Sequence, residues 1–89
     1  MKIKEGFVLK KIAGSTVAVP VGDNLVNLKL MLTLNESGVF LWEALKEDIT
    51  EEALAEKLMA EYQVEKAVAE ADVAEFVKTL KENQIIDEA

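Results

Sequence analysis

The stretch LTLNESGVFLWEAL, Leu32 to Leu45, changes its periodicity at Asn35. Before Asn35, leucine alternates with other residues, which is the pattern of a half-buried strand. After it, large apolar residues recur at helical spacing and include Trp42. The Asn side chain is a favoured N-cap because it accepts a hydrogen bond from a free backbone N–H of the first helical turn. The sequence therefore predicts a strand that passes directly into a helix at Asn35.

The strand that leads into this junction is predicted to run from Leu25 to Leu34. Its alternation assigns one face to the core and leaves the other face mixed. The core-facing positions are Val26, Leu28, Leu30, Leu32 and Leu34. The mixed face holds Leu25, Asn27, Lys29, Met31 and Thr33.

Two shorter β-like runs precede this strand. FVLKKIAG, Phe7 to Gly14, and STVAVPVG, Ser15 to Gly22, are rich in β-branched residues and meet at the Ala13–Gly14 step. This arrangement predicts a hairpin. Pro20 has no backbone N–H to donate, so it is expected at the end of the second strand or on a sheet edge.

Two further helices are predicted after the helix that starts at Asn35. The first is capped by Thr50 and runs to about Tyr62, and the second extends from near Lys66 to Asn83. The last helix has a predicted buried face of Val73, Phe76, Val77 and Leu80. The predicted fold class is α+β: one domain, residues 1–89, with a three-stranded antiparallel β-sheet followed by three helices in a winged helix-turn-helix-like arrangement.

Composition excludes several kinds of chemistry. The 89 residues contain neither cysteine nor histidine, so thiolate catalysis and the commonest general base and metal ligand are missing. The many carboxylates fit exposed helix faces and helix starts, and no catalytic constellation stands out. We therefore expect no enzyme activity, no metal and no cofactor.

Charge and hydropathy restrict the partners. The net charge is −7, and all ten basic residues are lysines. Residues 1–35 have five lysines against two acids (+3), whereas residues 36–89 have five lysines against fifteen acids (−10). Acidic helices without arginine do not suit phosphate or base recognition, so no binding to nucleic acid is expected. No apolar run reaches the length of a membrane span and no signal peptide is recognisable, which predicts a cytoplasmic protein.

The motif MLTLNESGVFLWEAL resembles that of the PqqD-like proteins, in which a strand ends in Leu-Asn, a Glu-Ser/Thr-Gly turn follows and a Trp lies on the next helix. The segments EGFVLKKIAGSTVAVPVG, ITEEALAEKLMAEYQV and ADVAEFVKTLKENQII are also similar to that family. The resemblance implies a domain that binds the leader segment of a ribosomally made precursor peptide. It also implies that the domain presents this peptide to a modifying enzyme, often a radical S-adenosylmethionine (SAM) enzyme.

An unpaired strand edge can bind an extended peptide as an added strand. If the last helix lies beside the edge strand Asn27 to Thr33, the two elements form a cleft. The candidate peptide-binding residues are Asn27, Leu28, Lys29, Leu30, Met31, Leu32, Thr33, Val68, Ala71, Asp72 and Glu75. Alternatively, the first two strands cover this edge, and Val68 and Ala71 pack against the rest of the protein without a role in peptide binding. A winged-helix transcriptional regulator and a subunit that binds only another protein remain the alternative functions.

Overall fold

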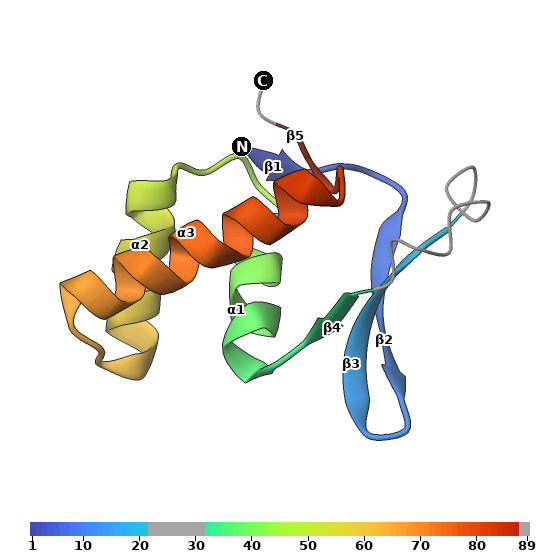
Figure 1. Cartoon of the computed structure of the whole chain (residues 1–89), viewed down its shortest axis with the longest axis horizontal. Coiled ribbons are helices and arrows are strands. Elements are labelled where there is room, and N and C mark those ends of the chain that lie inside the picture. The colour runs from blue at the N-terminus through green and yellow to red at the C-terminus, as the bar shows by residue number, and fades with distance from the viewer. Residues whose placement is uncertain (22–31, 88–89) are drawn as a thin grey trace.

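The computed structural model describes residues 1–21 and 32–87. These residues form two small sheets and three helices, arranged as Figure 1 shows. The elements in chain order are β1 (Lys2–Ile3), β2 (Phe7–Ile12), β3 (Ser15–Pro20), β4 (Leu32–Leu34), α1 (Glu36–Ala44), α2 (Glu51–Tyr62), α3 (Lys66–Glu82) and β5 (Ile86–Asp87). The predicted α+β fold, with a three-stranded antiparallel sheet before three helices, is confirmed. No helix in the described ranges is both long and apolar enough to cross a membrane.

The three-stranded sheet has the order β2-β3-β4, and both pairs are antiparallel. The β2–β3 hairpin turns at Ala13 and Gly14, whose φ angles are 52° and 84°. Positive φ at both central residues is typical of the two-residue turn that matches the twist of a hairpin. The second strand ends at Pro20, as predicted. In the other pair, Thr16 of β3 lies opposite Leu34 of β4.

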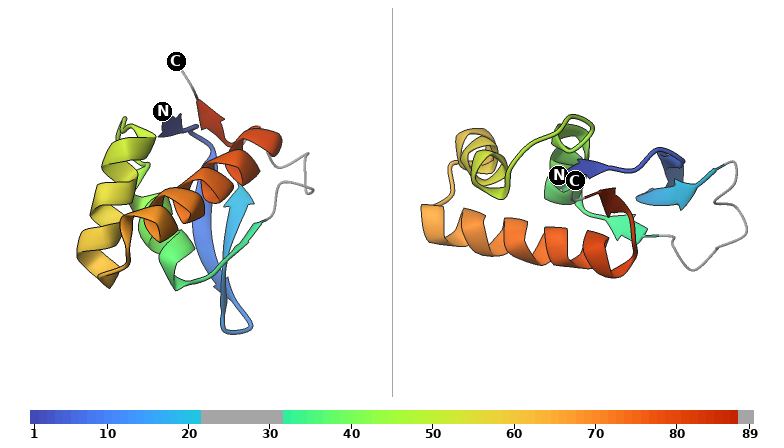
Figure 2. Two further views of the ribbon diagram at one scale, coloured as in Figure 1. Left: turned by 60° about the vertical axis from the view of Figure 1, so that its left-hand side comes forward. Right: turned by 90° about the horizontal axis from the view of Figure 1, so that it is seen from above.

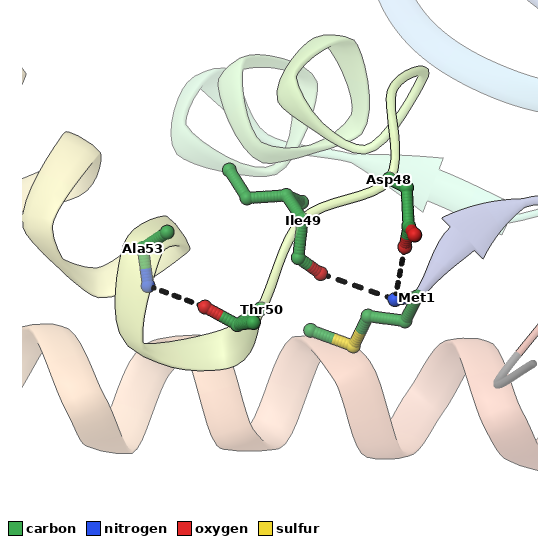
Figure 3. Close-up of polar contacts among 5 residues, drawn as sticks. All are labelled: Met1, Asp48, Ile49, Thr50 and Ala53. Atoms are coloured by element: carbon green, nitrogen blue, oxygen red, sulfur yellow. Dashed lines mark hydrogen bonds and ion pairs between the residues drawn. The ribbon is translucent and has the colours of Figure 1, made fainter.

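The strand-to-helix junction at Asn35 is confirmed. The backbone N–H of Gly38 donates to Asn35 Oδ1 over 2.8 Å, so Asn35 is the N-cap of α1. Only the last three residues of the predicted strand, Leu32–Leu34, lie in β4; residues 25–31 of that prediction lie outside the described residues. Thr50 caps α2 in the same way, with Ala53 N–H donating to its Oγ1 over 3.1 Å (Figure 3).

The core lies between the helices and the inner face of the larger sheet. Trp42 is 1% exposed and packs in this core, as predicted. Val73, Val77 and Leu80 of α3 are also buried, but the prediction that Phe76 belongs to the same buried face is wrong in part. Phe76 is only half-buried because it lies at the margin of the core-facing side of α3, where a groove begins.

A second sheet, which is not predicted from the sequence, joins the two ends of the described chain. β1 pairs antiparallel with β5, with Ile3 opposite Ile86. The Met1 ammonium donates to Asp48 Oδ1 over 2.6 Å and to the Ile49 carbonyl oxygen over 3.2 Å (Figure 3). The first residues of the chain are thereby fixed to the connection between α1 and α2.

The two views of Figure 2 show α3 running beside both α1 and α2, while β2 and β3 extend away from the helices as a hairpin. The polypeptide passes from β4 through Asn35 into α1 without a loop. This direct connection places the end of β4, the first turn of α1 and the middle of α3 around a common surface groove.

Candidate peptide-binding groove

A groove of about 510 Å³ opens between β4, the start of α1 and one side of α3. Its lining combines buried apolar side chains with polar ones. The lining residues are Leu32, Thr33, Leu34, Asn35, Ser37, Gly38, Leu41, Asp72, Glu75, Phe76 and Thr79.

One wall of the groove is the outer edge of β4. β4 pairs with β3 along one edge, and β2 lies on the far side of β3. No other strand among the described residues pairs with β4. Backbone N–H and C=O groups along such an edge can pair with an added strand. The alternative in which the first two strands cover this edge therefore does not hold for Leu32–Leu34.

The floor of the groove is apolar. Leu34 and Leu41 are 7% and 2% exposed, and the half-buried ring of Phe76 flanks them. Gly38 lies close to both side chains: a Cβ atom there would be in ordinary van der Waals contact with Leu34 Cβ (3.4 Å) and Phe76 Cε1 (3.5 Å), and only 3.1 Å from Asn35 Oδ1. The first turn of α1 therefore packs against the end of β4 and against α3. Such a floor can accept an apolar side chain of a bound peptide.

The opposite wall comes from one face of α3. Asp72, Glu75, Phe76 and Thr79 are spaced at i, i+3, i+4 and i+7, so they share this face. Thr79 Oγ1 donates to the Glu75 carbonyl oxygen over 3.1 Å, within the helix. In the described ranges, neither Asp72 nor Glu75 forms an ion pair. The wall therefore presents two carboxylates beside an aromatic ring.

The first helical turn of α1 adds polar groups at the end of β4. Asn35 Oδ1 accepts from the Gly38 N–H and, over 3.1 Å, from Ser37 Oγ. These contacts fix the Asn35 side chain at the rim, where the open strand edge meets the helix. The rim is consequently preorganised by capping, the same interaction that starts α1.

The predicted site residues have three different outcomes. Leu32, Thr33, Asp72 and Glu75 come together around the groove. Val68 and Ala71 are exposed on α3 but do not line the groove, and their exposure contradicts the alternative that they only pack. The predicted residues Asn27, Leu28, Lys29, Leu30 and Met31 lie outside the described residues.

Seven lining residues were not among the site residues predicted from the sequence. They are Leu34, Asn35, Ser37, Gly38, Leu41, Phe76 and Thr79. The helical spacing from Asp72 would have identified Phe76 and Thr79, which lie four and seven residues further on. The contribution of α1 had no such signal, because it depends on how the strand–helix junction lies against α3.

The described residues contain no cluster of candidate metal ligands. No group of three or more acidic side chains there is arranged to hold a metal ion. With neither histidine nor cysteine in the sequence, the groove offers backbone edges, apolar surface and two carboxylates. These groups suit recognition of an extended chain.

The fold and groove define a small α+β domain with an open sheet edge beside a helix. Residues 25–86 match the family model described as coenzyme PQQ synthesis protein D, well over half of the chain. The chain therefore belongs to the PqqD family, which confirms the resemblance noted from the sequence.

Two solved structures share this fold. One is described as TbiB1 in complex with the TbiA(beta) leader peptide; it is 24% identical, with a TM-score of 0.77, and the match covers all of this chain and 98% of that one. The other, lasso peptide synthetase B1 complexed with the leader peptide, is 23% identical with a TM-score of 0.72, covering 94% and 93% of the two chains. A search of curated proteins found no match.

Proposed function

We propose that this protein binds the leader segment of a ribosomally synthesised precursor peptide, which adds as a strand to the open edge of β4. The observation that carries the proposal is the groove between that edge and α3. Two proteins of the same fold, whose structures are described as complexes with a leader peptide, support the choice of ligand.

The physical basis is strand addition combined with apolar anchoring. Main-chain hydrogen bonds to a sheet edge provide affinity that depends little on sequence, and side-chain pockets provide specificity. The leader would pair with Leu32–Leu34 and place an apolar side chain over Leu34, Leu41 and Phe76. The proposed site continues along the predicted strand residues 27–31 and, on α3, toward Val68 and Ala71. A dissociation constant between about 1 μM and 1 nM would correspond to about 8–12 kcal/mol.

The chemistry is assigned to a partner enzyme. We propose that the bound precursor is presented in the cytoplasm to a peptide-modifying enzyme, of which a radical SAM enzyme is the type implied by the sequence resemblance. The protein itself would act without catalysis, as a recognition subunit. A modification assay with enzyme and precursor should give little product until this protein is added, and the protein with the precursor alone should give none.

A filled groove provides the test of the binding site. Thr79→Arg adds a long side chain to the α3 wall, and Thr79 is outside the buried core. Ala74→Arg is the matched control, since Ala74 is exposed on the same helix and does not line the groove. Isothermal titration with the synthetic leader of the precursor encoded with this protein should give at least tenfold weaker binding for Thr79→Arg and unchanged binding for Ala74→Arg.

Equal binding by both variants would contradict the proposed site, provided that their circular dichroism spectra match that of the wild type. Absence of leader binding in the wild-type protein, with the enzyme still captured, would instead favour a subunit that binds only another protein.

A further inference from the structure

The α3 wall of the groove carries a pair of like charges. Asp72 and Glu75 are three residues apart on one helical face, where carboxylates repel each other. No lysine lines the groove among the described residues. Both carboxylates therefore face the space that a bound peptide would occupy, without a counter-charge from the described lining.

No lysine among the described residues forms an ion pair with either carboxylate. Asp72 has Val68 and Phe76 at the i−4 and i+4 positions, and Ala69 and Glu75 at i−3 and i+3, so no lysine lies within one turn of it on its face. Lys78 is one turn after Glu75, but its Nζ lies 3.9 Å from Glu82 Oε1 and both side chains are exposed. A cationic ligand group would relieve the repulsion between Asp72 and Glu75.

The carboxylates are adjacent to the apolar floor. Phe76 follows Asp72 by four residues, an axial rise of about 6 Å along a helix. Alternate residues of a strand point to the same side and are about 6.6 Å apart. One face of an added strand could thus place an apolar side chain over Phe76 and, two residues away, a side chain beside the carboxylates.

We propose, building on the proposed function, that the preferred leader segment carries a lysine or arginine two residues from its apolar anchor, and that Asp72 and Glu75 select this cation. The groove would then discriminate among peptides by charge as well as by shape. Acidic segments would be rejected, because a peptide carboxylate on that face would meet two carboxylates of the wall.

A selection experiment tests the inference without knowledge of the natural leader. A display library of random short peptides is selected on three immobilised proteins: the wild type, the double variant Asp72→Asn with Glu75→Gln, and the control Glu56→Gln with Glu70→Gln. The control removes the same charge at exposed positions outside the groove. We expect lysine or arginine to be enriched two positions from an apolar residue on the wild type and the control, and this enrichment to be lost on the groove variant.

A selected peptide then provides the quantitative test. Replacement of its basic residue by glutamine should weaken binding to the wild type about three- to tenfold, as for one or two partly exposed ion pairs. The same replacement should have little effect on binding to the groove variant. Glu75→Lys should restore affinity for the peptide in which glutamate replaces the basic residue.

Each result distinguishes this inference from the proposed function. Peptides that bind at β4, mapped by amide chemical shifts, but show no basic preference would overturn the charge selection and leave the peptide site intact. A basic preference that persists in the groove variant would overturn the assignment to Asp72 and Glu75. If no peptide binds at the β4 edge of the wild type, the proposed function itself fails.

Discussion

Replacement of Trp42 by alanine should remove much of the stability of this domain. The indole is 1% exposed and lies in the core beneath the strand–helix junction. A buried Trp removes about 150–250 Å² from water, which at about 25 cal/mol per Å² is worth about 4–6 kcal/mol. The alanine side chain keeps a small part of this burial energy, so we expect the free energy of unfolding to fall by about 3–5 kcal/mol.

A loss of this size is a large part of the total stability of the domain. At about 0.05–0.15 kcal/mol per residue, a chain of 89 residues has a stability of about 4–13 kcal/mol. Urea denaturation followed by far-UV circular dichroism measures the change, because the variant lacks the single tryptophan needed for fluorescence. Trp42→Phe should cost less, and the exposed Glu47→Ala should stay within about 0.5 kcal/mol of the wild type.

An unchanged denaturation midpoint in Trp42→Ala would refute this reasoning. So would red-shifted tryptophan emission from the native wild-type protein, since a buried indole emits at shorter wavelength than one in water.

Three further predictions concern capping, pH and nucleic acid. Asn35→Ala removes the acceptor for Gly38 N–H and should destabilise the fold by about 1 kcal/mol, measured by urea denaturation; an unchanged midpoint would contradict the capping role. The Met1 ammonium, through its hydrogen bond and charge, holds the pKa of Asp48 below its usual value. Because this pKa is lower in the folded protein than in the unfolded chain, where it is about 3.9, the ionised carboxylate stabilises the fold above that pH, and its contribution is lost as the pH falls through the folded value. The difference in unfolding free energy between the wild type and Asp48→Asn should therefore shrink below about pH 4. A difference that grows there would refute the contact. Finally, the acidic exposed face of α3 should prevent salt-dependent binding to duplex DNA in a gel-shift assay; a shift that weakens steeply with added salt would support a regulator.

The main architecture was predictable because its signals are local. Asn35, Thr50 and the Ala13–Gly14 step each fix a boundary through contacts within a few residues, and each boundary is where the sequence predicted it. The buried position of Trp42 follows from helical spacing alone. Capping and turn chemistry act over short distances, so a single sequence is enough to recognise them.

The pairing of β1 with β5 had no comparable signal. Each strand has two residues, too few to show an alternation, and the pairing joins the two ends of the described chain. Contacts between residues far apart in the sequence hold β1 in place, such as the hydrogen bond that the Ile3 N–H donates to the Leu45 carbonyl oxygen over 2.9 Å. Neither partner of such a contact indicates the other in the sequence.

The candidate site was predictable only where its residues follow from local patterns. Thr33, Asp72 and Glu75 follow from a strand edge and a polar helix face, and both elements were predicted. Phe76 was assigned to the core because its spacing fits the buried face, yet it lies where that face meets the groove. The position of that margin depends on how α3 packs against β4 and α1, which local patterns do not specify.

An amide chemical-shift titration with the leader peptide tests the central claim most directly, because it reports affinity and location together. Strand addition at the β4 edge predicts saturable shifts that are largest in Leu32–Asn35 on one side of the groove and in Asp72–Thr79 on the other. Shifts confined to the β2–β3 hairpin, or to α2 around Leu54 and Leu58, would contradict the account.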